Sequence, residues 1–163
     1  MIEIPLTQGR VALVDDCDAA LADTRWYARR DRHTFYAYRK GPRAEKPRRT
    51  FLLHRVILGA ARGVEVDHVN GDGLDCRRAN LRLASRSQNQ ANRLHLVSNV
   101  SGFRGVSFMR ARGRWLASIR VNRRTRNLGA FESPAEAARA YDAAARSAFG
   151  PFARLDFPGT EAA

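Results

Sequence analysis

Residues 64–93, VEVDHVNGDGLDCRRANLRLASRSQNQANR, hold the one group of side chains in the sequence that suggests chemistry. An alternation of apolar and polar residues around the adjacent pair Asp67 and His68 predicts a short strand. The glycine-containing string NGDG predicts a reversal, and the apolar positions of LRL predict a return strand. A polar segment that opens at Ser85 has the chemistry of a helix start. We therefore expect strand, long reversal, strand and helix, an order that brings Asp67, His68 and a helix asparagine together.

The spacing of these residues resembles that of the HNH nuclease family. The pair Asp67 and His68 is followed by Asn80 and Asn89, and the strings LHRVILGA and VDHVNGDGLDCRRANLRL are similar to the same family. More narrowly, the stretch resembles the homing-type HNH endonucleases of phages and introns, in which the last metal-ligand histidine is an asparagine. The resemblance implies an α+β fold with a ββα-metal (His-Me finger) core.

The residue types suit hydrolysis of a phosphodiester, which needs an activated water and stabilised charge at the phosphoryl oxygens. His68, with an ordinary pKa near neutrality, suits the general base. The resemblance makes Asp67 and Asn89 the protein ligands of one Mg²⁺ or Mn²⁺ ion, because these hard cations prefer oxygen donors. Water and substrate phosphate must then complete the metal's shell, and no structural zinc is expected.

Two further residues join the catalytic set through the resemblance. Asn80 would brace the reversal and orient His68. Arg86, one helical turn before Asn89, would contact the scissile phosphate. Other interpretations stay open: Asn80 as a turn residue only, and Arg86 as part of the basic surface. Asn92, one turn after Asn89, competes with it for the ligand role.

The charge of the chain points to a polyanionic partner. Its 163 residues include 29 Lys and Arg against 16 Asp and Glu, a net charge of +13, and only Lys40 and Lys46 are lysines. Arginine binds phosphate bidentately and stacks on bases, which suits nucleic acid; a GC-rich genome is the other explanation. We expect double-stranded DNA as the partner, with steep salt dependence. No membrane partner is expected, because no segment approaches the roughly 20 apolar residues of a spanning helix.

The start of the chain and its two cysteines indicate the cellular compartment. The opening string MIEIPLTQGR lacks the basic region and the apolar core of a signal peptide. Cys17 and Cys76 form no CxxC motif, which favours two reduced thiols over a disulfide framework or a zinc ribbon. We expect a cytoplasmic, nucleoid-associated protein of a bacterial or phage-infected cell, not a secreted one, and a monomer in the absence of DNA.

The pattern before residue 94 predicts one nuclease domain, residues 1–93. Residues 1–49 form a small mixed lead-in, and apolar residues at helical spacing predict a helix at 50–60, before the core at 64–93. His54 lies on that helix and is kept out of the catalytic set. A lone histidine on an apolar helix is more often a packed, hydrogen-bonded residue.

A second domain, residues 102–158, is expected after a linker at 94–101 and before a tail at 159–163. Three alternating runs predict three strands. Ser133-Pro134 then opens an Ala-rich helix that ends at Gly150-Pro151. One face of the middle strand is apolar and must be covered by the helix, whereas the other face carries arginines.

The strings FRGVSFMRARGRWLASIRV, LGAFESPAEAARAYDAAARSAFG and LDFP resemble the APETALA2-type DNA-binding domain, which lays a three-stranded sheet in the major groove. The resemblance implies sheet positions that face DNA at Arg104, Arg114, Ser118, Arg120 and Asn127, with Arg110, Arg112 and Arg126 nearby. Better-known members differ at Ser107, Met109, Ser118 and Asn127, so no sequence preference transfers. The alternative for the arginines is a merely solvated sheet face.

These features indicate a site-directed DNA endonuclease of phage or mobile-element type. One active site per chain implies a nick unless two chains meet on DNA or one chain acts twice. A catalytically inactive DNA-binding regulator with the same two domains is the first alternative. An RNA-binding or packaging protein is the second, because charge alone does not distinguish nucleic acids.

Overall fold

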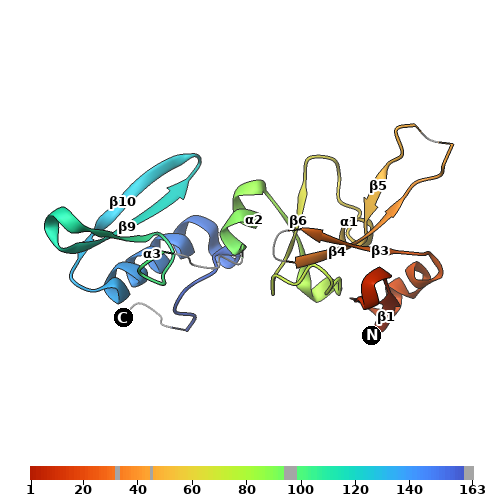
Figure 1. Ribbon diagram of the computed structural model, residues 1–163, viewed down its shortest axis with the longest axis horizontal. Helices are drawn as coiled ribbons and strands as arrows, with labels where there is room; N and C mark the ends of the chain where they lie inside the picture. Colours follow the sequence, from red (N-terminus) through yellow and green to blue (C-terminus); the bar gives the residue numbers. More distant parts are fainter. Residues whose placement is uncertain (32–33, 45, 94–98, 160–163) are drawn as a thin grey trace. The chain divides into compact units, whose positions relative to one another are not determined.

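The computed structural model describes residues 1–31, 34–44, 46–93 and 99–159. The chain divides into two compact units, Met1–Arg86 and Ser87–Ala163, and each is described by itself. Antiparallel sheets with few helices make up the chain (Figure 1), so the predicted α+β class is confirmed.

The first unit begins with a hairpin. β1 (Ile2–Pro5) pairs antiparallel with β2 (Val11–Val14) across the 3-10 turn η1 (Thr7–Gly9). The acidic segment that follows forms the 3-10 helix η2 (Asp16–Asp23). The inner side chains of the hairpin pack with Trp26 in the core of this unit.

A three-stranded antiparallel sheet follows, in the order β3-β4-β5. β3 (Tyr27–Asp31) pairs with β4 (Thr34–Lys40), which pairs with β5 (Thr50–Leu52). The third strand corrects the predicted helix at 50–60, because the helix α1 covers only Leu53–Ile57. The spacing of apolar residues did not reveal that Thr50–Leu52 find ladder partners on β4, which satisfy their backbone hydrogen bonds.

Residues 64–93 fold in the predicted order. β6 (Glu65–His68) pairs antiparallel with β7 (Leu81–Ala84), and α2 (Arg86–Asn92) follows at once. The long connection between the strands ends in the 3-10 helix η3 (Arg78–Asn80).

Long-range hydrogen bonds attach this connection to the rest of the first unit. Leu13 on β2 donates its N–H to Leu74 O (2.9 Å) and accepts from Cys76 N (2.8 Å). Gly73 N donates to Thr34 Oγ1 on β4 (2.9 Å). The connection is therefore a fixed part of the unit and not a projecting loop.

The second unit is a three-stranded sheet in the order β10-β9-β8, packed on one long helix. Its elements are β8 (Val106–Met109), η4 (Arg110–Arg112), β9 (Arg114–Val121), β10 (Arg124–Phe131), α3 (Pro134–Phe149) and η5 (Gly150–Phe152). A capping box begins α3, with Ser133 and Glu136 bonding each other's backbone N–H groups. Asn122 and Arg123 both have positive φ, as a tight turn between β9 and β10 requires.

The division between the units falls after Arg86, whereas the sequence pattern predicts a nuclease domain up to residue 93. All of α2 after Arg86 lies in the second unit, where Arg104 bonds Ala91 O and Arg93 O. Most of the expected linker, residues 94–98, lies outside the described residues.

Gly73 is expected to be required for its lack of a side chain. A Cβ there would overlap the Phe35 carbonyl oxygen and lie 2.6 Å from the Tyr36 ring. Gly73→Ala should lower the stability of the first unit by about 1–3 kcal/mol, as overpacking does. Urea unfolding followed by Trp26 fluorescence measures this in a Trp115→Phe background, where Trp26 is the only tryptophan. Unchanged stability would mean that the strand and the connection separate at little cost.

Candidate active site and nucleic-acid interface

Asp67 and His68 occupy neighbouring positions on β6 and are 4% and 5% exposed. Strand alternation directs the two side chains to opposite sides of β6. The Asp67 carboxylate accepts from Arg82, its cross-strand neighbour on β7, with 2.8 Å to Nε and 2.7 Å to the second nitrogen. The pair therefore presents a carboxylate on one side of β6 and an imidazole on the other.

Two other rings surround His68. The His54 ring from α1 meets it edge to face at 4.9 Å between centroids. Tyr36 on β4 lies 5.3 Å from His54 and 5.7 Å from His68. Neither residue belongs to the catalytic set that the sequence predicts. His54 lies in LHRVILGA, one of the strings that resemble the HNH family, and this was a signal that it belongs near the site. No such signal exists in the sequence around Tyr36.

Burial keeps this histidine pair neutral. Desolvation, together with His68, Arg55 and Arg29, lowers the pKa of His54 from 6.5 to about 3. Desolvation also lowers the pKa of His68, and the opposing pull of Asp67 and nearby acids does not reverse it. At pH 7 His68 is therefore a neutral imidazole, the form that accepts a proton.

Asn80 closes the connection that begins after His68. Its Oδ1 accepts from Asn70 N (2.9 Å), its Nδ2 donates to Asp75 O (2.8 Å), and its backbone oxygen accepts from Val69 N (2.9 Å). Hydrogen bonds from Arg77 lower the pKa of Asp75, so this carboxyl is ionised within the loop. The Asn80 side chain thus bonds both arms of the reversal next to His68.

The remaining residues of the predicted catalytic and metal set lie on α2. Arg86 is exposed, Asn89 is half-buried and Asn92 is buried. Arg86 ends the first unit, whereas both asparagines belong to the second, so the choice of metal ligand stays a prediction.

The residue types of the two predicted metal ligands suit a hard cation. Asp67 offers a carboxylate and Asn89 an amide oxygen, the donors that Mg²⁺ and Mn²⁺ accept. Within the described ranges, no group of three or more His, Cys, Asp or Glu side chains could hold a metal ion.

In the second unit, the outer face of the β10-β9-β8 sheet, turned away from α3, carries part of the predicted DNA-binding set. Arg114, Ser118 and Arg120 alternate on β9 with the buried Ala117 and Ile119. By register, Asn127 pairs with Ser118 and shares the outer face. Arg120 is exposed, whereas Arg114 forms an exposed ion pair with Glu132 at 3.1 Å. Asn127 Oδ1 accepts from Gly129 N at the β-bulge (2.9 Å).

Other predicted DNA-binding residues lie elsewhere. Arg110 and Arg112 are exposed in the turn η4. Arg126 is exposed too, but it pairs with Ile119 and so belongs to the α3 side of the sheet. Arg104 is not on a strand, and its side chain is only 9% exposed. Arg123, which is not in the predicted set, is exposed in the positive-φ turn between β9 and β10.

The depressed pKa of His54 predicts acid sensitivity. The unfolded state binds a proton near pH 6.5 and the folded state only near pH 3. Stability is therefore present above pH 6.5 and lost as pH falls from 6.5 toward 3. Urea midpoints at pH 7.5, 6.0 and 5.0 in EDTA, again read by Trp26 in Trp115→Phe, should decline. His54→Gln should flatten this decline, and an equal decline in both proteins would exclude His54 as its cause.

Comparison with known proteins gives matches of two kinds. A family model described as HNH endonuclease matches residues 51–91. Dehydration-responsive element-binding protein 2A of Arabidopsis thaliana is 52% identical over 62 residues, covering 37% of this chain and 18% of that protein. Ethylene-responsive transcription factor ERF010 of Arabidopsis thaliana is 48% identical over 58 residues, covering 34% and 31%. Ethylene-responsive transcription factor 3 of Nicotiana tabacum is 53% identical over 58 residues, covering 34% and 25%.

The chain thus spans between 18% and 31% of the length of these three relatives. No solved structure matches it. Within the described part of the chain, no helix has the length and apolarity to cross a bilayer. The matches agree with both resemblances in the sequence. These findings support an HNH domain and an AP2-like domain in the chain.

Proposed function

We propose that this protein is a metal-dependent DNA endonuclease that nicks a duplex at a preferred site. The observation that carries the proposal is His68, a buried neutral imidazole beside Asp67 within the stretch that matches HNH endonucleases. The order β6, β7, α2 is the order of elements that a ββα-metal core would have, which supports the proposal. The homing or phage character remains part of the proposal.

The chemistry follows from the residues present. His68 accepts a proton from a water molecule. At the same time the water oxygen forms a bond to phosphorus, and the bond between phosphorus and the 3′ oxygen breaks. Asp67 and Asn89 would hold one Mg²⁺ or Mn²⁺ ion, which when bound stabilises charge on the phosphoryl and leaving oxygens. Asn80 would keep His68 in place through the braced reversal, and Arg86 would contact the scissile phosphate.

The AP2-like unit would hold the duplex. Arg114, Ser118, Arg120 and Asn127 on the outer sheet face, with Arg110 and Arg112 in the adjoining turn, would supply phosphate and base contacts. Phosphate contacts position the protein and base contacts select its site, so cutting and site selection would belong to different units of the chain.

Plasmid cleavage tests the nuclease. Supercoiled plasmid with Mg²⁺ or Mn²⁺ should give relaxed circles with the wild type, and EDTA should abolish them. His68→Ala should reduce the rate at least about 100-fold, the usual contribution of a general base. Duplex binding in EDTA and the thermal melting curve of the variant control for folding. Equal cleavage by both proteins would remove His68 from the mechanism, and linear product would indicate paired active sites.

A DNA-binding regulator with an inactive HNH domain is the second candidate. The observation that favours it is the Asp67–Arg82 ion pair, because a bonded arginine competes with a metal for the same carboxylate. Tight duplex binding without cleavage by either metal would establish this function instead.

The outer sheet face predicts a difference between two arginines. Arg120 and Arg126 are both exposed, but by register they lie on opposite faces of the sheet. Arg120→Ala should weaken duplex binding by about 1–3 kcal/mol, and lower the salt slope by about 1 if it contacts phosphate. Arg126→Ala should have the smaller effect.

Fluorescence anisotropy in EDTA, from 50 to 200 mM salt, measures both variants. Equal losses would mean that charge alone and not the outer face binds DNA. Competition by duplex RNA as effective as by duplex DNA would favour the RNA-binding alternative, because the deep major groove of RNA excludes such a sheet.

A further inference from the structure

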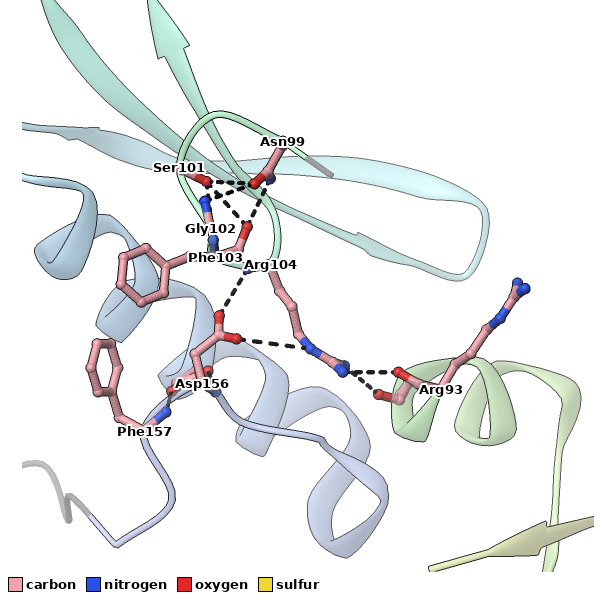
Figure 2. A network of polar contacts seen from close by, with 10 residues as sticks. Arg93, Asn99, Ser101, Gly102, Phe103, Arg104, Asp156 and Phe157 are labelled. Carbon is pink, nitrogen blue, oxygen red and sulfur yellow. Dashed lines mark hydrogen bonds and ion pairs between the residues drawn. The ribbon is translucent and has the colours of Figure 1, made fainter. Parts of the chain in front are cut away.

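Arg104 makes contacts that differ from those of a DNA-binding arginine. Its side chain donates to two backbone oxygens at the end of α2, Ala91 O at 3.3 Å and Arg93 O at 2.8 Å. Figure 2 shows the guanidinium reaching from the segment before β8 to the end of this helix. All of these residues belong to the second unit.

The contact meets a physical need of α2. The last carbonyls of a helix have no intrahelical partners and form the negative end of its dipole, where a cation is stabilising. α2 has seven residues and no basic residue in its last turn. Arg104, which is distant in sequence, supplies that cation together with two hydrogen bonds.

The other side of Arg104 is anchored by Asp156. The Asp156 carboxylate accepts from Arg104 N at 2.8 Å and lies 3.9 Å from its Nε. Asp156 N in turn donates to Asp142 on α3 at 3.0 Å, and Phe157 N donates to the same carboxylate at 2.8 Å. A continuous series of polar contacts therefore joins the end of α2 to α3, the helix under the sheet.

The backbone around Arg104 is held as well. Asn99 and Ser101 donate to Phe103 O, and the Phe103 ring lies 5.5 Å from that of Phe157 (Figure 2). Gly105 O accepts from Ser118 N at 2.9 Å, and a Cβ at Gly105 would overlap the Tyr141 ring. Arg104 is thus presented to α2 from a fixed segment.

We propose that Arg104 is a positioning residue of the nuclease, which fixes α2, and with it Asn89, to the AP2-like unit. The proposal rests on the proposed function, in which Asn89 is a metal ligand. The body that holds the duplex would then also hold the helix that supplies this ligand. Arg104 would act on metal binding and cleavage, and not on the affinity for DNA that the AP2 resemblance implies.

Three measurements on Arg104→Ala test this, with Arg120→Ala as the matched arginine control. Hydrogen exchange without DNA or metal should speed up in the backbone amides at 90–93 of Arg104→Ala and stay unchanged in Arg120→Ala. Duplex affinity in EDTA should stay within about twofold for Arg104→Ala and fall for Arg120→Ala. At saturating DNA, the Mg²⁺ concentration for half-maximal cleavage by Arg104→Ala should rise on the order of tenfold, as when a residue that supports a metal ligand is lost.

Arg104→Lys separates the two roles further. A lysine still contacts a phosphate, but it lacks the planar fork that reaches two carbonyls at once. Arg104→Lys should therefore behave like Arg104→Ala. The backbone amides at 90–93 should exchange faster than in the wild type, and half-maximal cleavage should need more Mg²⁺. If Arg104→Ala does not fold, Asp156→Asn, which weakens the anchor and keeps the arginine, takes its place.

The outcomes are distinct for the two proposals. Unchanged exchange of α2 together with lost DNA affinity in Arg104→Ala, restored by lysine, would overturn the positioning role and make Arg104 a phosphate contact. A wild type that binds DNA but never cleaves would refute the nuclease. The exchange measurement would then still decide whether Arg104 fixes α2.

Discussion

The hydrogen bonds of the Asn80 side chain are the constraint on which the first unit depends. They join the two arms of the connection between β6 and β7, immediately after His68. With the reversal closed in this way, its middle can bond to β2 through Leu74 and Cys76. Gly73 then lies against the backbone of β4 next to Tyr36. The pairing of β6 with β7, the position of His68 and the packing of its aromatic neighbours all rely on this closed loop.

The surroundings of His68 come from three separate segments. β6 carries it, α1 brings the His54 ring against it, and β4 brings Tyr36. Packing of this kind removes water from the imidazole and holds it neutral, which is what a base for water activation requires. It also leaves two histidines uncharged in a folded unit, at the expense of stability in acid.

The arginines of the second unit differ in their surroundings. The outer face of its sheet carries exposed arginine at Arg120, which suits contact with phosphate. Arg104, in contrast, lies at the end of α2, where it bonds a backbone carbonyl and Asp156. The arginines of the second unit thus divide between its surface and its framework, because a guanidinium donates hydrogen bonds to backbone carbonyls as well as to phosphate oxygens.

The sequence by itself determined the α+β class, the β6–β7–α2 order around Asp67 and His68, and the sheet and capped helix of the second unit. These features are local, since they follow from the alternation of apolar residues, turn residues and the Ser133 and Glu136 cap. The tertiary structure alone decided that Thr50–Leu52 form a strand and that His54 and Tyr36 adjoin His68. It also decided that Arg104 bonds α2. In each case the outcome depends on a partner distant in sequence, and no local pattern specifies which partner the folded chain will bring near.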